Sequence, residues 1–150
     1  EQKGFKEKDF AFFHPGGALG RRLLLKVEDI MRGGAANPIV NENKKVSQVL
    51  FAITRARAGS ATVVDKEGKL KGIFTDGDLR RHLESDKNLL SRRISEVMTK
   101  NPAVVNQDML AAEAMCILQA RKIDEIPVVD KNMRPVGLLD VQDLLKVGLV

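Results

Sequence analysis

The sequence predicts an α/β fold in which two copies of one β-α-β-β-α unit pack as a pseudo-two-fold pair. The first observation is an internal repeat, because Asp65 and Asp130, like Gly72 and Gly137, are separated by 65 residues. A period of that length is typical of a supersecondary unit used twice. The second observation is that both copies alternate short apolar runs with segments of helical periodicity, in the same order. This order is typical of mixed α/β layers.

The first copy is predicted to hold three strands and two helices. A short strand covers residues 38–40, and a helix over residues 45–57 places Val46, Val49 and Ile53 on one face. Residues 60–65 and 70–75 read as a β-hairpin around a polar turn at residues 66–69. A second helix follows over residues 76–83.

The second copy repeats this order. It is predicted to contain strands at residues 104–105, 126–130 and 136–139, a turn at 131–134, and helices at 110–121 and 141–147. Pro135 enters the last strand at an edge, where a missing N–H is tolerated. With both helices on one side, each sheet keeps an open face. We expect the two open faces to cover each other, with the helices outward.

Residues 1–26 lie outside the repeat. They contain a short apolar patch at residues 10–13, a turn at 14–17 and a possible short helix over 19–25. We expect a division into a linker (1–26), a first repeat unit (27–91) and a second repeat unit (92–150). The chain starts at Glu1 rather than at a methionine. We therefore expect it to be a piece of a larger protein.

The composition excludes several classes of protein. Hydrophobic residues make up 43% of the chain and charged residues 30%, as in a soluble globule. The net charge is +5, but the basic residues are interleaved with acidic ones along the chain. The chain also has no Trp or Tyr on which the bases of a nucleic acid could stack. No apolar run reaches membrane-spanning length. The single cysteine, Cys116, excludes an internal disulfide, favours the cytoplasm and is predicted to lie on a buried helix face.

Three short motifs, each present twice, carry a resemblance to a known family. They are the turns of helix at residues 29–31 and 96–98, the strands ending in Asp65 and Asp130, and a Gly-x-x-[Ser/Thr]-x-x-Asp turn from strand to helix. Together they resemble the CBS domain, and two copies resemble a Bateman pair. The resemblance covers residues 27–150 and implies a regulatory module.

The segment before the repeats narrows the resemblance. Residues 12–24, which include His14-Pro15-Gly16-Gly17, look like the junction in arabinose-5-phosphate isomerases of the Kdo pathway. In that family a sugar isomerase (SIS) domain precedes a CBS pair. The resemblance implies a whole enzyme that interconverts D-arabinose 5-phosphate and D-ribulose 5-phosphate for lipopolysaccharide synthesis, as a homo-oligomer. It also implies that His14 contributes to the SIS active site, and that this chain alone is inactive.

The chemistry of the first copy centres on Thr75 and Asp78. Their spacing predicts a capping box at a helix start. A carboxylate also accepts hydrogen bonds from ribose hydroxyls, and a hydroxyl beside free helix N–H groups suits a phosphate. In CBS domains these are the roles of the two motif residues, so the resemblance implies that Thr75 and Asp78 bind a nucleotide. Arg80 and Arg81 either supply positive charge there or simply face solvent.

The second copy departs from this pattern. Asp143 keeps the ribose-type carboxylate, but Asp140 stands where Ser or Thr is usual. Asp140 is a good helix cap and a poor neighbour for phosphate. We therefore expect the first site to dominate. The resemblance implies CMP-Kdo or an adenine nucleotide as ligand. The alternative is a ligand-free structural module that stabilises the oligomer. Nothing else in the repeats forms a catalytic or metal-binding pattern, and His82 is expected on a helix surface.

Overall fold

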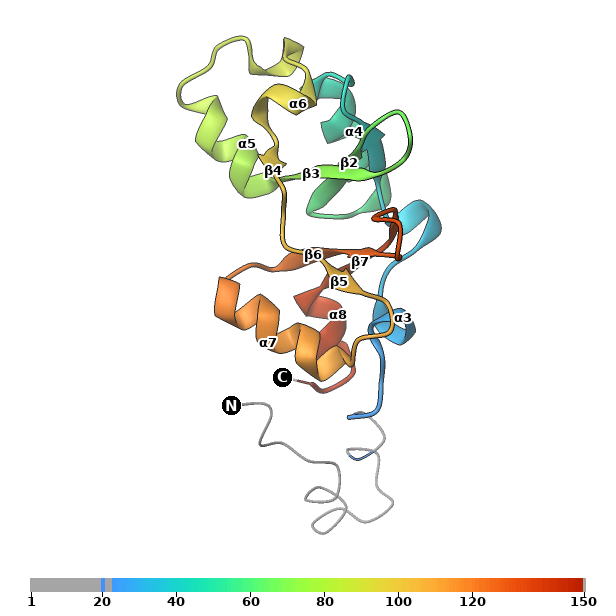
Figure 1. The fold of residues 1–150 in the computed structure, drawn as a ribbon. Helices are drawn as coiled ribbons and strands as arrows, with labels where there is room; N and C mark the ends of the chain where they lie inside the picture. The colour runs from blue at the N-terminus through green and yellow to red at the C-terminus, as the bar shows by residue number, and fades with distance from the viewer. Residues whose placement is uncertain (1–19, 21–22, 150) are drawn as a thin grey trace.

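The computed structural model describes residue 20 and residues 23–149, and it confirms the predicted pair of α/β units. Figure 1 shows two stacked lobes, each with a sheet toward the middle of the molecule and helices on its outer side. In the described part of the chain, no helix is long and apolar enough to cross a membrane.

The first lobe holds a four-stranded sheet in the order β1-β2-β3-β4. Its strands are β1 (Ile39–Asn41), β2 (Ser60–Val64), β3 (Leu70–Thr75) and β4 (Thr99–Lys100). β1 runs parallel to β2, whereas β2, β3 and β4 are antiparallel neighbours. Helices α4 (Val46–Ala56) and α5 (Asp76–Leu83) and the 3-10 turns η2 (Gly34–Ala36) and η3 (Leu89–Ser91) complete its connections. β4 was not predicted, because two exposed residues carry no strand pattern.

The second lobe holds a three-stranded sheet in the order β5-β6-β7. Its elements are β5 (Val105–Asn106), α7 (Ala111–Arg121), β6 (Glu125–Val129), β7 (Pro135–Asp140) and α8 (Val141–Lys146). The predicted strands and helices of both copies are all present, with ends that differ by a residue or two. Pro135 begins the edge strand β7, as expected.

The repeated aspartates shape the hairpin turns between the paired strands. The Oδ1 atom of Asp65 accepts hydrogen bonds from the backbone N–H groups of Glu67 and Lys69, at 2.8 and 3.0 Å. Asp130 binds Asn132 and Arg134 in the same way. These bonds, led by the one from Lys69, lower the pKa of Asp65. The repeated Asp is therefore explained by turn chemistry.

The two copies exchange their first helices. Helix α3 (Val27–Ile30) packs on α7 and β7 of the second lobe, and α6 (Ile94–Val97) packs on β3 of the first. Backbone bonds fix both exchanges: Val27 donates to the Met109 carbonyl at 2.8 Å, and Val46 donates to the Arg92 carbonyl at 2.9 Å. Each lobe is therefore built from both copies, and the division at residues 91 and 92 separates the copies along the chain but not the lobes.

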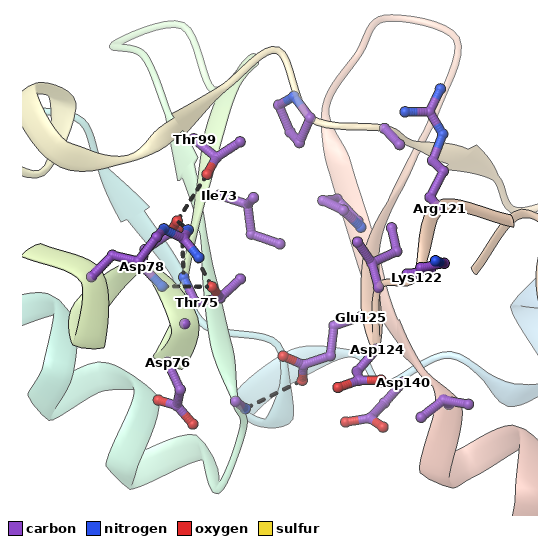
Figure 2. A pocket seen from close by; sticks show the side chains of 18 of the residues that line it. Ile73, Thr75, Asp76, Asp78, Thr99, Arg121, Lys122, Asp124, Glu125 and Asp140 are labelled. Carbon is purple, nitrogen blue, oxygen red and sulfur yellow. Dashed lines mark hydrogen bonds and ion pairs between the residues drawn. The ribbon is translucent and has the colours of Figure 1, made fainter. Parts of the chain in front are cut away.

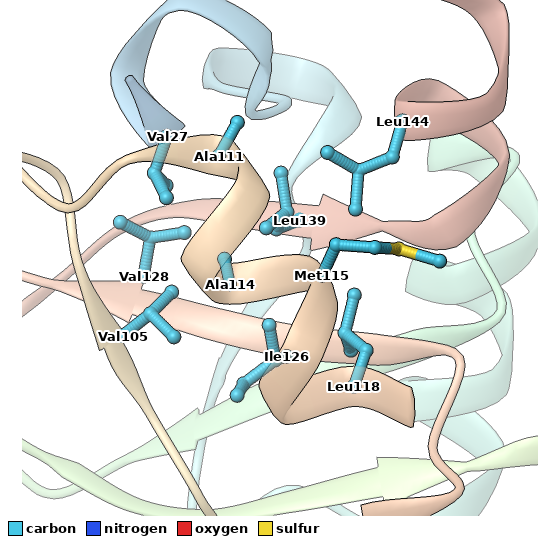
Figure 3. Close-up of a cluster of buried hydrophobic side chains, with 10 residues drawn as sticks. All are labelled: Val27, Val105, Ala111, Ala114, Met115, Leu118, Ile126, Val128, Leu139 and Leu144. Carbon is cyan, nitrogen blue, oxygen red and sulfur yellow. The ribbon is translucent and has the colours of Figure 1, made fainter. Parts of the chain in front are cut away.

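Each lobe has its own aliphatic core. Figure 3 shows the second, where Val27 of α3 lies among side chains of α7, α8 and the sheet, including the fully buried Leu139 and Leu144. The first core is centred on Phe74 and includes Ile94 of α6. Because each core needs a helix from the other copy, the two copies depend on each other for burial of apolar surface.

Two glycines let the exchanged segments approach the sheets. A Cβ on Gly72 would lie 2.7 Å from the Thr99 carbonyl oxygen and close to Met98. Gly137 faces Met31 and the Arg32 carbonyl oxygen in the same way. The repeat thus places a glycine in β3 and in β7 where backbone crosses closely.

Some predictions for the ends and edges of the chain need correction or remain open. Leu23 and Leu24 lie in a turn, so the possible helix over residues 19–25 does not reach its predicted end. Residues 10–17 lie outside the described part. His82 is half-buried rather than on the surface, because its Nε2 lies 3.1 Å from the Val97 carbonyl oxygen of α6. Cys116 is half-buried on α7.

Candidate functional site

A cleft of about 790 Å³ opens where the two lobes meet. Figure 2 shows its two walls, one from β3, α5 and β4, and the other from the end of α7, β6 and the start of α8. Apolar side chains in the lining include Ile73, Pro102, Ile123 and Pro127, and most of the remaining lining residues are polar or charged. This combination of a concave apolar surface with a few polar groups is typical of small-molecule sites.

The Thr75–Asp78 corner lies in the first wall. The Thr75 hydroxyl accepts a bond from the Asp78 N–H at 3.1 Å, and the Asp78 carboxylate accepts one from the Thr75 N–H at 3.0 Å. This is the predicted capping box, and it begins α5. Asp78 is only 3% exposed and also accepts bonds from the Thr99 hydroxyl, at 3.0 Å, and from Arg81. The side chain of Arg81 is 68% exposed, so solvent reaches this partner of Asp78.

Basic side chains frame the cleft from both walls. Arg80 and Arg81 project from α5, while Arg121 and Lys122 end α7. Lys122 adopts a left-handed backbone conformation, with φ of 55°, and its pseudo-equivalent Arg57 at the end of α4 does the same. In each copy this left-handed residue ends the helix and turns the chain toward the following strand. The four cations are exposed and can pair with an anionic group, although five carboxylates also line the cleft.

Acidic side chains gather on the second wall. Asp124, Glu125 and Asp140 lie side by side in Figure 2. Asp140 caps α8 by accepting a bond from the Gln142 N–H at 2.8 Å, as its sequence position predicted. Glu125 reaches across to the first lobe, where its Oε2 accepts a bond from the Gly59 N–H at 3.2 Å.

Burial changes the proton affinity of Glu125. Desolvation, assisted by repulsion from Asp140, raises the pKa of Glu125 to about 7, although the hydrogen bond from the Gly59 N–H opposes the change. The carboxyl group therefore titrates near neutral pH, inside the cleft. Such a group responds to whatever charge a ligand brings beside it.

The structure brings together three of the four predicted nucleotide-binding residues. Thr75, Asp78 and Asp140 all line the one cleft. Asp143 is bound instead by Arg32, whose Nε lies 2.8 Å from its Oδ2. His14 lies outside the described residues.

Sequence reasoning missed three residues at these sites. Thr99 and Arg32 follow the short helices α6 and α3, so they occupy corresponding places in the two copies. Glu125 corresponds to Ser60, which starts the equivalent strand. A signal for Glu125 was present in the sequence, because an acidic residue begins a strand that is otherwise apolar. The helix exchange that brings Thr99 and Arg32 to the motifs left no such signal.

The comparison with protein families decides the family of this chain. Residues 27–85 and 94–149 both match the CBS domain. The chain belongs to the CBS domain family. Its two lobes are thus a CBS pair, and the Thr75–Asp78 corner lies in the cleft between them.

Curated relatives extend the match to the whole chain. The arabinose 5-phosphate isomerase KdsD of Pseudomonas aeruginosa is 48% identical over 150 residues, which is 100% of this chain and 46% of that protein. The KdsD of Francisella tularensis is 44% identical over 98% of this chain and 45% of its own length. The chain therefore spans about half the length of the curated relatives it matches.

Solved structures share the fold at lower identity. The CBS domain pair of protein MJ0100, in complex with 5′-methylthioadenosine and S-adenosyl-L-methionine, matches with a TM-score of 0.75 at 24% identity, over 83% of this chain and 95% of that one. CBSX2 in complex with AMP matches with a TM-score of 0.73 at 22% identity, over 83% and 96% of the two chains. These likenesses show the CBS pair fold.

Proposed function

We propose that this CBS pair is a regulatory module that binds a nucleotide in the cleft between its lobes. The observation that carries the proposal is the Asp78 carboxylate, which is 97% buried yet lines the cleft and holds a partner, Arg81, whose side chain is 68% exposed. Two vicinal ribose hydroxyls can take the place of Arg81 on such a carboxylate, because ionised acceptors form the stronger hydrogen bonds. This replacement would also release the Arg81 guanidinium.

The rest of the cleft supports a nucleotide. Released Arg81, with Arg80 and the N–H groups at the start of α5, supplies positive charge beside Thr75 for a phosphate. Ile73, Ile123 and Pro127 offer apolar surface for a base. Asp124 and Glu125 provide acceptors for an exocyclic amino group of adenine or cytosine.

The identity of the ligand is proposed from two sources. The matched structures hold adenosine compounds, AMP in one and 5′-methylthioadenosine with S-adenosyl-L-methionine in the other. This supports an adenine nucleotide. The resemblance to isomerases of the Kdo pathway supports CMP-Kdo as a feedback ligand. Both carry a ribose and an amino-bearing base, so both fit the chemistry of the cleft.

We assign the chain to the C-terminal half of an arabinose 5-phosphate isomerase. The support is the identity to KdsD proteins over the whole of this chain, together with their extra length. In this proposal a SIS domain precedes residue 1, the enzyme is a cytoplasmic homo-oligomer that serves lipopolysaccharide synthesis, and His14 completes the SIS active site. Imidazole suits proton transfer in aldose–ketose isomerisation. The 150-residue chain alone is expected to be inactive.

Calorimetric titration with AMP and with CMP-Kdo tests the module. Asp78→Ala should weaken binding by about 1.5–3 kcal/mol, because ribose hydroxyls lose a charged acceptor. Asp108→Ala, which removes an exposed carboxylate outside the cleft, is the matched control and should bind as the unaltered chain does. Thermal unfolding of each variant checks that loss of the α5 capping box has not unfolded it. If neither compound binds the unaltered chain, the structural role becomes the better explanation.

A further inference from the structure

The second motif already holds a positively charged group from the chain itself. Arg32 places its Nε 2.8 Å from Asp143 Oδ2, one terminal nitrogen 3.4 Å from Asp140 Oδ2, and the other 3.3 Å from the Arg57 carbonyl oxygen. The three acceptors come from α8, its cap and the end of α4. The guanidinium is therefore held from both lobes.

The first motif has no cation at the corresponding position, and its carboxylate pairs instead with Arg81 of α5, whose side chain is 68% exposed against 22% for Arg32. Thr99 follows Met98 as Arg32 follows Met31, and the two methionines face the equivalent glycines, Gly72 and Gly137. Thr99 donates one neutral hydrogen bond to Asp78 at 3.0 Å. The same place in the fold thus carries a short hydroxyl at one motif and a long cation at the other.

A ribose that bound at the second motif would have to displace Arg32 from these contacts. Its side chain is 22% exposed, and that of Asp143 is 15% exposed. The hydrogen bond to Asp143, with the charges of Asp143, Asp140 and Glu125, raises the pKa of Arg32, although desolvation opposes the change. A ribose offers only neutral hydroxyls to Asp143. To bind there, it would have to break a charge-assisted bond and leave a partly buried guanidinium facing fewer acceptors.

We propose that Arg32 is a built-in occupant of the second motif, which limits each chain to one nucleotide, bound at the Thr75–Asp78 motif. This inference rests on the proposed function and goes beyond it, since it names the residue that makes the two halves of a symmetric fold unequal. Besides Asp140, which stands where the first copy has Thr75, this asymmetry lies in one side chain contributed through the helix exchange.

Equilibrium titration of the 150-residue chain with AMP as the probe tests the role of Arg32. The unaltered chain should bind one molecule, and Asp78→Ala should bind it about 10- to 150-fold more weakly, the fold-change that corresponds to about 1.5–3 kcal/mol. Adding Arg32→Thr, the residue found at position 99, to Asp78→Ala should restore one molecule, and further addition of Asp143→Ala should remove it. The matched control adds Arg93→Thr, at an exposed arginine before α6, and should restore nothing. Thermal unfolding confirms that each variant is folded.

The variants of this titration distinguish failure of the Arg32 proposal from failure of the proposed nucleotide-binding function. Two molecules on the unaltered chain would overturn the role of Arg32 and leave the nucleotide-binding function standing. If Arg32→Thr restores no molecule, even when Asp140→Thr also returns the usual motif residue, Arg32 does not exclude ligand and the inference is wrong. If the unaltered chain binds no AMP but Arg32→Thr alone gains an Asp143-dependent molecule, the proposed first site fails while the role of Arg32 holds.

Discussion

Glu125 makes the stability of this CBS pair depend on pH near neutrality. Its pKa is about 7 in the folded chain against an ordinary value of 4.5. The folded state therefore holds a proton that the unfolded state releases at lower pH. Ionised Glu125 destabilises the fold above pH 7, and this cost fades as the pH falls toward 4.5.

The size of the effect follows from the two pKa values. At about 1.4 kcal/mol for each pH unit, the gap corresponds to at most about 3 kcal/mol at pH 8, and about 1 kcal/mol remains at pH 5. Because the carboxyl group reaches the solvent of the cleft, we expect about half of this, or roughly 1–2 kcal/mol at pH 8. Asp65, Asp86 and Asp130, whose pKa values are lowered by hydrogen bonds, lose their contributions only at more acidic pH.

Glu125→Gln is the informative change, since the amide keeps the shape and can still accept the Gly59 hydrogen bond. The variant should be more stable than the unaltered chain at pH 8 by that 1–2 kcal/mol, and the advantage should shrink steadily to pH 5. Urea unfolding followed by circular dichroism at intervals of pH measures both free energies. Glu84→Gln, at an exposed position after α5, is the control and should leave the pH profile unchanged. A stability difference for Glu125→Gln that is constant between pH 5 and 8 would refute the reasoning.

Three further predictions address the core, the helix exchange and the whole enzyme. Phe74→Ala should lower the free energy of unfolding by about 3–5 kcal/mol in denaturant titrations, because the ring is fully buried; a loss below about 1 kcal/mol would contradict that burial. Gly72→Ala should cost about 1–3 kcal/mol, because the added methyl lies 2.7 Å from the Thr99 carbonyl oxygen and must displace β4; an unchanged midpoint of unfolding would argue against this close crossing. In the full-length protein, which we propose to be an isomerase, His14→Ala should cut turnover severely while leaving the circular dichroism spectrum unchanged, and near-normal turnover would exclude His14 from the proposed active site.

The local sequence determined the elements of this fold and one corner of the site. Apolar periodicity located the strands and the main helices, and the period of the repeat predicted the paired lobes. The Thr75–Asp78 capping box was predictable because both partners lie within one turn of helix, where backbone geometry alone brings them together. The same holds for Asp140 as the cap of α8.

Only the tertiary structure decided what surrounds those motifs. Arg32 and Asp143 are 111 positions apart, and Gly59 and Glu125 are 66 apart. The first contact forms because the exchanged helix α3 carries Arg32 onto the second lobe, and the second contact forms because the two lobes meet. Burial between the lobes raises the pKa of Glu125, and the helix exchange gives the two motifs different partners. Desolvation and pairing between distant residues depend on which segments of the chain meet in the fold, and no local sequence pattern specifies those contacts.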